Sequence, residues 1–183
     1  FIIFLGNREM FFIAFLGLII VISEAPYLNA RTELVVYRTS KTVWCRAMII
    51  YLALQTICYV SILSMICMII AIPRAYIGNA WSLTFYKSTK IIAAQGMNYH
   101  FLNPPNSELL NLFSPWKCFI YTVILMCAYG FVLSLLVFAF NFKFSKKTGV
   151  CAAIGVHLVS FASARGVFYL PLRWTPGALA NIN

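Results

Sequence analysis

Long apolar runs alternate with short polar segments along the chain. Four runs reach or approach the length of a membrane span, at about residues 10–23, 47–72, 116–140 and 149–165. A helix needs about 20 mainly apolar residues to cross the hydrocarbon core, and it satisfies its backbone hydrogen bonds internally. The pattern therefore predicts an all-α integral membrane protein, a polytopic bundle of transmembrane helices in a single domain over 1–183.

Local signals set the ends of these runs. Pro26 is expected to end the first helix, because proline clashes with the preceding turn. Thr39 or Ser40 is a candidate N-cap for the second helix, and Ser114-Pro115 is typical of the start of the third. In an alternative reading, 1–22 is one continuous helix; we prefer the shorter one because it keeps the charged Arg8-Glu9 pair out of the bilayer core.

The most densely charged stretch is Ser23–Arg46, between the first two spans. Within it, Thr32–Tyr37 reads as a short amphipathic helix. The long segment between the second and third spans contains a second amphipathic candidate at Ser82–Met97, expected to lie on the membrane surface. Basic residues are densest in Ser23–Arg46 and in the turn Asn141–Thr148, and short basic connectors favour the cytoplasm. We expect both to face the cytoplasm.

Composition narrows the class of protein further. Hydrophobic residues make up 62% of the chain and charged residues only 10%, which does not suit a water-soluble fold. The net charge of +10 is spread over the ends of the spans, so the basic excess indicates contact with the lipid bilayer and not with nucleic acid. The six cysteines form no C-x-x-C pair and are expected to be reduced, buried side chains.

Motifs for catalysis or ion coupling are missing from the sequence. It has no phosphate-binding loop, no H-E-x-x-H and no G-x-S-x-G. Its four acidic residues, all glutamate, lie at span ends or in loops, so no intramembrane carboxylate is present to relay protons or sodium ions. We expect no catalytic residues, no metal site and no enzymatic activity of the chain itself.

Polar residues inside the spans are the candidates for a substrate path. These are Gln55, Ser61, Ser134 and His157. For Gln55, lining a cavity and bridging two helices remain open alternatives. His157 is either a polar contact in a path or a neutral imidazole that hydrogen-bonds across helices near Ser160 or Ser163, and we favour the second.

The run Glu33–Leu52, ELVVYRTSKTVWCRAMIIYL, resembles the segment before the third transmembrane helix of type-two ABC exporter permeases. In that family an acidic residue, an apolar triplet and an R-[TS]-[SG]-[RK]-x-x-W stretch lead into the span. The matching positions are Glu33, Leu34, Val35, Val36, Arg38, Thr39, Ser40, Lys41 and Trp44. The downstream order, an outer segment, a span, a short basic turn and a small-residue span, is also similar.

This resemblance implies a six-helix permease subunit of a bacterial plasma membrane, of which the four runs would be the second to fifth helices and this chain a fragment. Two such subunits, identical or different, would pair with two cytoplasmic ATPase subunits, and these would carry the ATP and Mg²⁺. A coupling helix near 31–37 would dock on the ATPase. Its contact residues would be Arg31, Glu33, Leu34, Tyr37, Arg38 and Lys41.

The chain departs from the family pattern in three places. It shows four spans instead of six, it has Cys45-Arg46-Ala47 where the family often has lysine or glycine-lysine, and its segment between the second and third spans is longer. The alternative function is that of a scaffold or interaction subunit of a membrane complex, with no transport path of its own. A polar cavity lined by the candidate path residues would favour transport, and a dry, tightly packed bundle would favour the scaffold.

Overall fold

The computed structural model describes residues 8–27, 40–72, 81, 87, 113–144 and 147–164. In these ranges the chain forms four helices: α2 (Arg8–Val21), α4 (Lys41–Ala71), α7 (Pro115–Lys143) and α8 (Thr148–Ala164). The predicted helical class is therefore confirmed over the described residues. The surface helix expected at Ser82–Met97 and the amphipathic helix at Thr32–Tyr37 lie outside them.

The helix ends follow the capping signals. Ser40 has an extended backbone and its side chain accepts a hydrogen bond from the Val43 N–H at 3.4 Å, so α4 begins at Lys41, ahead of the apolar run. Ser114 precedes α7 with Pro115 at its first helical position, as predicted. The helix α2 ends at Val21, and a turn occupies the residues that follow it, up to and including Pro26. Pro26 therefore lies within that turn, five residues after the end of the helix, and does not itself end it.

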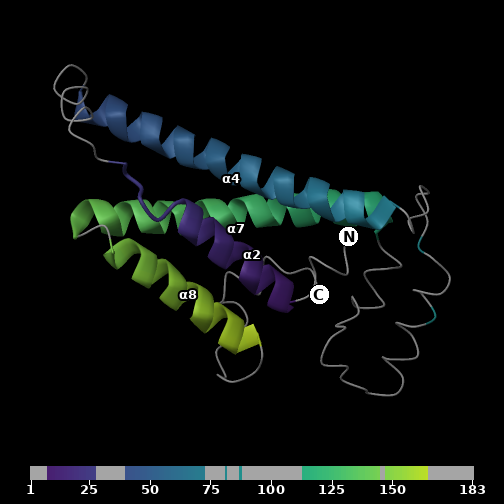
Figure 1. Ribbon diagram of the computed structural model, residues 1–183. Helices are drawn as coiled ribbons and strands as arrows, with labels where there is room; N and C mark the ends of the chain where they lie inside the picture. Colours follow the sequence, from purple (N-terminus) through teal and green to yellow (C-terminus); the bar gives the residue numbers. More distant parts are fainter. Residues whose placement is uncertain are drawn as a thin grey trace.

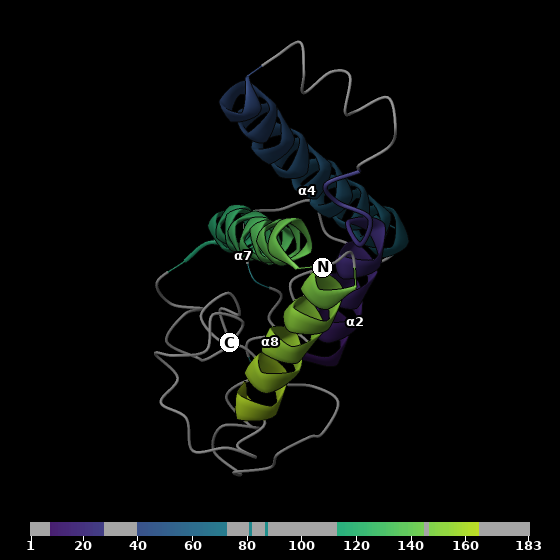
Figure 2. The same ribbon diagram turned by 90° about the vertical axis from the view of Figure 1, so that its left-hand side faces the viewer.

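Figure 1 shows α7 running alongside α4, with α8 on the opposite side of α7 from α4. Figure 2, viewed nearly along α7, confirms that α4 and α8 flank it and that α2 lies beside α8. Successive helices run in opposite directions, since Trp44 at the start of α4 packs against Phe138 and Phe142 at the end of α7. The helix α7 is thus the centre of the bundle.

One end of the bundle gathers the turn after α2, the start of α4, the end of α7 and the start of α8 (Figure 1). We call this the connector end. The described basic residues there are Lys41, Arg46, Lys143 and Lys147, all of them exposed. Ser23–Arg46 and the α7–α8 turn are predicted to face the same side of the membrane, and the described parts of both segments lie at the same end of the bundle.

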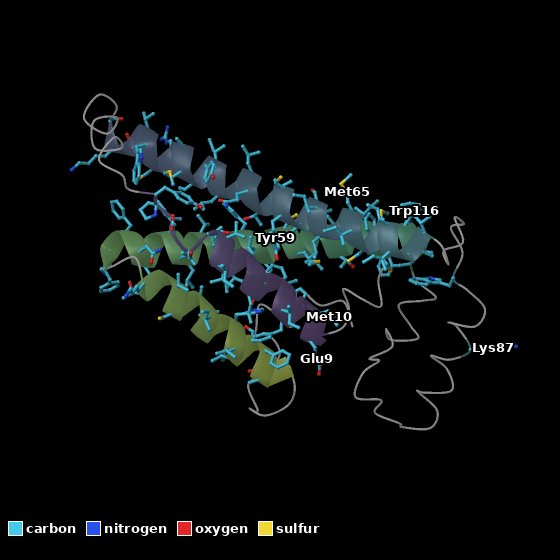
Figure 3. The ribbon with its side chains drawn as sticks, in the orientation of Figure 1. Glu9, Met10, Tyr59, Met65, Lys87 and Trp116 are labelled. Carbon is cyan, nitrogen blue, oxygen red and sulfur yellow. The ribbon has the colours of Figure 1, made fainter. Side chains whose placement is uncertain are left out.

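Two of the helices are long and apolar enough to cross a membrane, namely α4 with 31 residues and α7 with 29. At about 1.5 Å per residue each is about 45 Å long, which exceeds the hydrocarbon thickness of about 30 Å. The helices α2 and α8, with 14 and 17 residues, are apolar but shorter than a full span within the described ranges. Large apolar side chains cover the outside of the bundle, as Met65 on α4 illustrates (Figure 3).

Candidate functional site

The central helix α7 carries a buried polar side chain toward each of its neighbours. Tyr129 contacts α8, Ser134 contacts α4, and Asn141 contacts both the turn after α2 and the start of α8. All three are at least nine-tenths buried. These three polar side chains thus lie inside the bundle, and each has a partner on another element. This set of contacts is the candidate functional site.

His157 links three helices at one point. Its Nδ1 lies 2.8 Å from the Tyr129 hydroxyl of α7, and its Nε2 lies 3.1 Å from the Phe12 carbonyl of α2. A carbonyl only accepts, so Nε2 carries the proton and the neutral imidazole accepts the Tyr129 hydroxyl proton at Nδ1. The imidazole also stacks on the Phe12 ring, with centroids 4.8 Å apart and planes 8° apart.

Two hydroxyls meet between α4 and α7. Thr56 Oγ1 and Ser134 Oγ lie 3.0 Å apart, and each also lies 2.8 Å from the carbonyl one turn back in its own helix, Leu52 or Gly130. The two hydroxyls have two protons for these three contacts. At any moment, therefore, one of the three contacts has no proton and is not a hydrogen bond. Gly130 brings the helices close here, because an added Cβ would lie 2.8 Å from both Leu18 Cδ2 and Thr56 Cγ2.

Asn141 joins three elements at the connector end. Its Nδ2 donates to the carbonyls of Ser23, at 3.1 Å, and Ala25, at 2.7 Å, while its Oδ1 accepts the Gly149 N–H at 2.9 Å. The side chain therefore joins α7 both to the turn after α2 and to the first turn of α8.

The helix α4 is tied to α2 at two levels. Tyr59 donates its hydroxyl proton to the Ala14 carbonyl at 2.7 Å, across the face where Gly17 leaves room, and Figure 3 shows it between the two helices. Nearer the connector end, the Tyr27 hydroxyl lies 3.3 Å from Gln55 Oε1. Burial raises the pKa of the Tyr27 phenol above its ordinary value, so the hydroxyl remains a donor at neutral pH.

The predicted path residues occupy different places. Ser134 and His157 are buried in the interhelical contacts just described, and Gln55 is half-buried beside Tyr27. Ser61 is exposed on α4. As predicted, His157 forms hydrogen bonds across helices, and its partners are the Tyr129 hydroxyl and the Phe12 carbonyl. Ser163, near which this contact was expected, has a buried Oγ with no hydrogen-bond partner among the described residues.

The predicted ATPase-coupling residues Arg31, Glu33, Leu34, Tyr37 and Arg38 lie outside the described residues. Lys41 is the first residue of α4 and is exposed.

The cysteines are less uniformly buried than predicted. Cys67 and Cys118 are buried, whereas Cys58 and Cys151 are exposed on the outer surface, and all six are free. The expectation of burial is therefore wrong for these two, because each lies on the outward face of an apolar helix. Within the described ranges, no group of three or more His, Cys, Asp or Glu side chains is placed to hold a metal ion.

Sequence reasoning did not single out Tyr129, Thr56 or Asn141. A tyrosine inside an apolar run looks like an ordinary large hydrophobic residue, and Asn141 looks like part of the polar turn that follows the third span. A usable signal was present, because an amide or hydroxyl at membrane depth needs a partner on a neighbouring helix.

The chain matches no known protein family, no curated protein and no solved structure.

Proposed function

We propose that this chain is a membrane-embedded subunit of an ATP-driven exporter. The observation that carries membrane insertion is the distribution of polarity: the side chains of Thr56, Ser134, Asn141 and His157 are buried inside the bundle, while its outer surface is covered by many isoleucine, leucine and methionine side chains. A soluble helix places its polar face outward. On α4 the exposed apolar residues continue along nearly the whole helix, as expected of a surface in contact with lipid or with another membrane subunit.

The connector end would face the cytoplasm. Its described residues include Lys41, Arg46, Lys143 and Lys147 against one carboxylate, Glu24. Such an excess of basic residues near span ends favours the cytoplasmic side, where anionic lipids add attraction. A cytoplasmic ATPase would meet the chain at this end, through the segment that contains Arg31–Lys41.

Transport itself rests on the resemblance of Glu33–Leu52 to exporter permeases. Ser134 and His157 are engaged in contacts between helices, so they do not provide a path through the middle of the four described helices. The substrate path would instead run along the outer face of α4, where Ser61 is exposed, against a second permease subunit. Identical or different copies would both supply such a face.

The second candidate is a scaffold subunit of a membrane complex. The observation in its favour is that the buried polar groups of α7 bond to neighbouring helices, as in a tightly packed bundle. A scaffold would use the outer face of α4 to bind a protein without passing a substrate.

Purification of the full-length protein in mild detergent from its native host, with mass spectrometry of the associated proteins, separates the two. A stoichiometric ABC-type ATPase supports the exporter. A reproducible set of partners without any ATPase contradicts it and favours the scaffold.

One substitution tests the docking site directly. Arg38→Glu reverses a charge of a predicted ATPase-coupling residue, just after the predicted coupling helix, and should reduce the amount of ATPase recovered while the protein still inserts in the membrane. Lys143→Glu is the matched control, since it makes the same change at the connector end but on α7. Undiminished recovery with Arg38→Glu would contradict the assigned docking site.

A further inference from the structure

The turn that follows α2 is tightly built. The backbone N–H groups of Ser23, Ala25 and Tyr27 each donate to the carbonyl three residues earlier, at 3.2, 3.0 and 2.8 Å. Tyr27 has a φ of 52°, in the left-handed region that a bulky side chain rarely adopts. Such a backbone persists only where surrounding contacts determine it. The contacts around residues 22–27, here called the α2 turn, are therefore informative.

Asn141 is the contact on the α7 side. Its two N–H protons are both used, on the Ser23 and Ala25 carbonyls, and its oxygen is used by the Gly149 N–H. Rotating the amide by 180° would point its oxygen at two carbonyls and its N–H groups at a donor, so only one orientation is satisfied. The side chain is 6% exposed.

Gly149 is required for this arrangement. A Cβ at this position would overlap Asn141 Oδ1 and the Val137 carbonyl, both of which are fixed by helix α7. The first turn of α8 can approach Asn141 only because residue 149 has no side chain.

Tyr27 is the contact on the α4 side. Its ring packs edge-on against Tyr51, with centroids 5.7 Å apart, and its hydroxyl approaches Gln55. The α2 turn therefore touches α4 through Tyr27 and touches α7 and α8 through Asn141. In the sequence it leads directly into the charged segment assigned to ATPase coupling.

We propose that the α2 turn is a mechanical junction and that Asn141 is its positioning residue, so that a displacement of the turn is passed to α4 and to the α7–α8 end together. That the ATPase causes the displacement rests on the proposed function. The junction itself does not, because every contact in it lies within this chain.

Hydrogen–deuterium exchange of the full-length protein in lipid nanodiscs tests the junction without an ATPase. Asn141→Asp keeps the volume of the side chain but removes its N–H donors. An ionised aspartate has no donor at all, and a protonated one has a single O–H donor. We expect the backbone amides of Ser23, Ala25 and Tyr27 to exchange about tenfold faster or more, the order of change that follows loss of buried hydrogen bonds. Thr56→Val, on α4, removes the hydroxyl contact with Ser134 of α7, away from the turn, and should leave these amides unchanged.

Gly149→Ala is the second variant and serves if Asn141→Asp does not fold. This substitution keeps Asn141, but the new methyl group on α8 pushes against the Asn141 side chain. Faster amide exchange in residues 23–27 would then show that a change in α8 alters the α2 turn. Unchanged exchange at 23–27 in the folded variants would overturn the junction.

The assembly with its ATPase gives a separate readout. With Asn141→Asp we expect the ATPase to co-purify in normal amounts while the rate of ATP hydrolysis by the assembly falls several-fold. Normal hydrolysis would overturn the transmission. If no ATPase co-purifies with the wild-type protein, the exporter proposal fails, and the exchange measurement still decides the junction.

Discussion

The hydrogen bond between Tyr129 and His157 allows the contribution of one buried polar contact to be measured. Tyr129→Phe removes the hydroxyl and preserves the ring, which packs edge-on against Phe15 at 4.8 Å between centroids. The variant removes the 2.8 Å contact with Nδ1, together with the hydrogen bond between the same hydroxyl and Ser160, and leaves the aromatic packing in place.

The expected cost follows from the geometry. Hydrogen bonds between helices in membranes contribute about 0.6 kcal/mol on average and about 1.7 at most. His157 cannot compensate by changing tautomer, because Nε2 must keep its proton for the Phe12 carbonyl, so Nδ1 loses the Tyr129 donor. We therefore expect a loss in the upper part of this range, about 1–1.7 kcal/mol. His157→Leu should cost more, about 2–3 kcal/mol, because it also removes the bond to Phe12 and the ring stacking.

The double variant isolates the pair. If the two side chains act through their shared bond, the double variant should be less destabilised than the sum of the single ones by about 1 kcal/mol. Unfolding in mixed micelles titrated with a denaturing detergent, followed by far-ultraviolet circular dichroism and tryptophan fluorescence, supplies the three free energies. Reversibility is checked by refolding from the unfolded end of each titration.

A coupling below about 0.3 kcal/mol, the level at which independent sites add, would refute the reasoning. It would mean that Tyr129 and His157 each contribute through packing, and that the interior polar groups do not act as pairs.

Three further predictions use the same preparation or membranes. Thr56→Val should cost less than Tyr129→Phe, below about 1 kcal/mol, because the Thr56–Ser134 pair has too few protons to make all its bonds at once. Gly17→Ala should destabilise by about 1–2 kcal/mol because the new methyl displaces Tyr59, while Gly155→Ala, with nothing within 4 Å, should be neutral or stabilising; equal effects would contradict the packing. In a variant without native cysteines, Lys147→Cys should react with an impermeant maleimide only from the cytoplasmic side, and labelling of intact cells from outside would reverse the proposed orientation.

The sequence was sufficient to predict the helices and most of their ends. Ser40 and Ser114-Pro115 are capping signals whose chemistry acts locally, so the structure follows them. The end of α2 was less predictable, because the turn before Pro26 depends on Asn141, which is 116 residues away from Ala25 in the chain.

The inward faces could not be predicted in the same way. A helix that is apolar all round gives no periodic signal of which side packs inward. Trp44 illustrates the problem: tryptophan near the end of a span is typical of the membrane interface, yet this one is 8% exposed and packs against Phe138 and Phe142. Ser61 and Ser134 look equivalent in the sequence, and only the second faces another helix.

The polar contacts determine which faces of the helices pack together, which the apolar pattern does not specify. In lipid, apolar side chains gain little by leaving their surroundings for another helix, so packing and interhelical hydrogen bonds must select the register. Tyr129, Ser134 and Asn141 lie at three heights along α7 and bond to α8, α4 and the α2 turn. A shift of α7 by one turn, or a large rotation about its axis, would break all three of these contacts at once. This argues that a few polar residues, and not the many apolar ones, fix how this bundle is assembled.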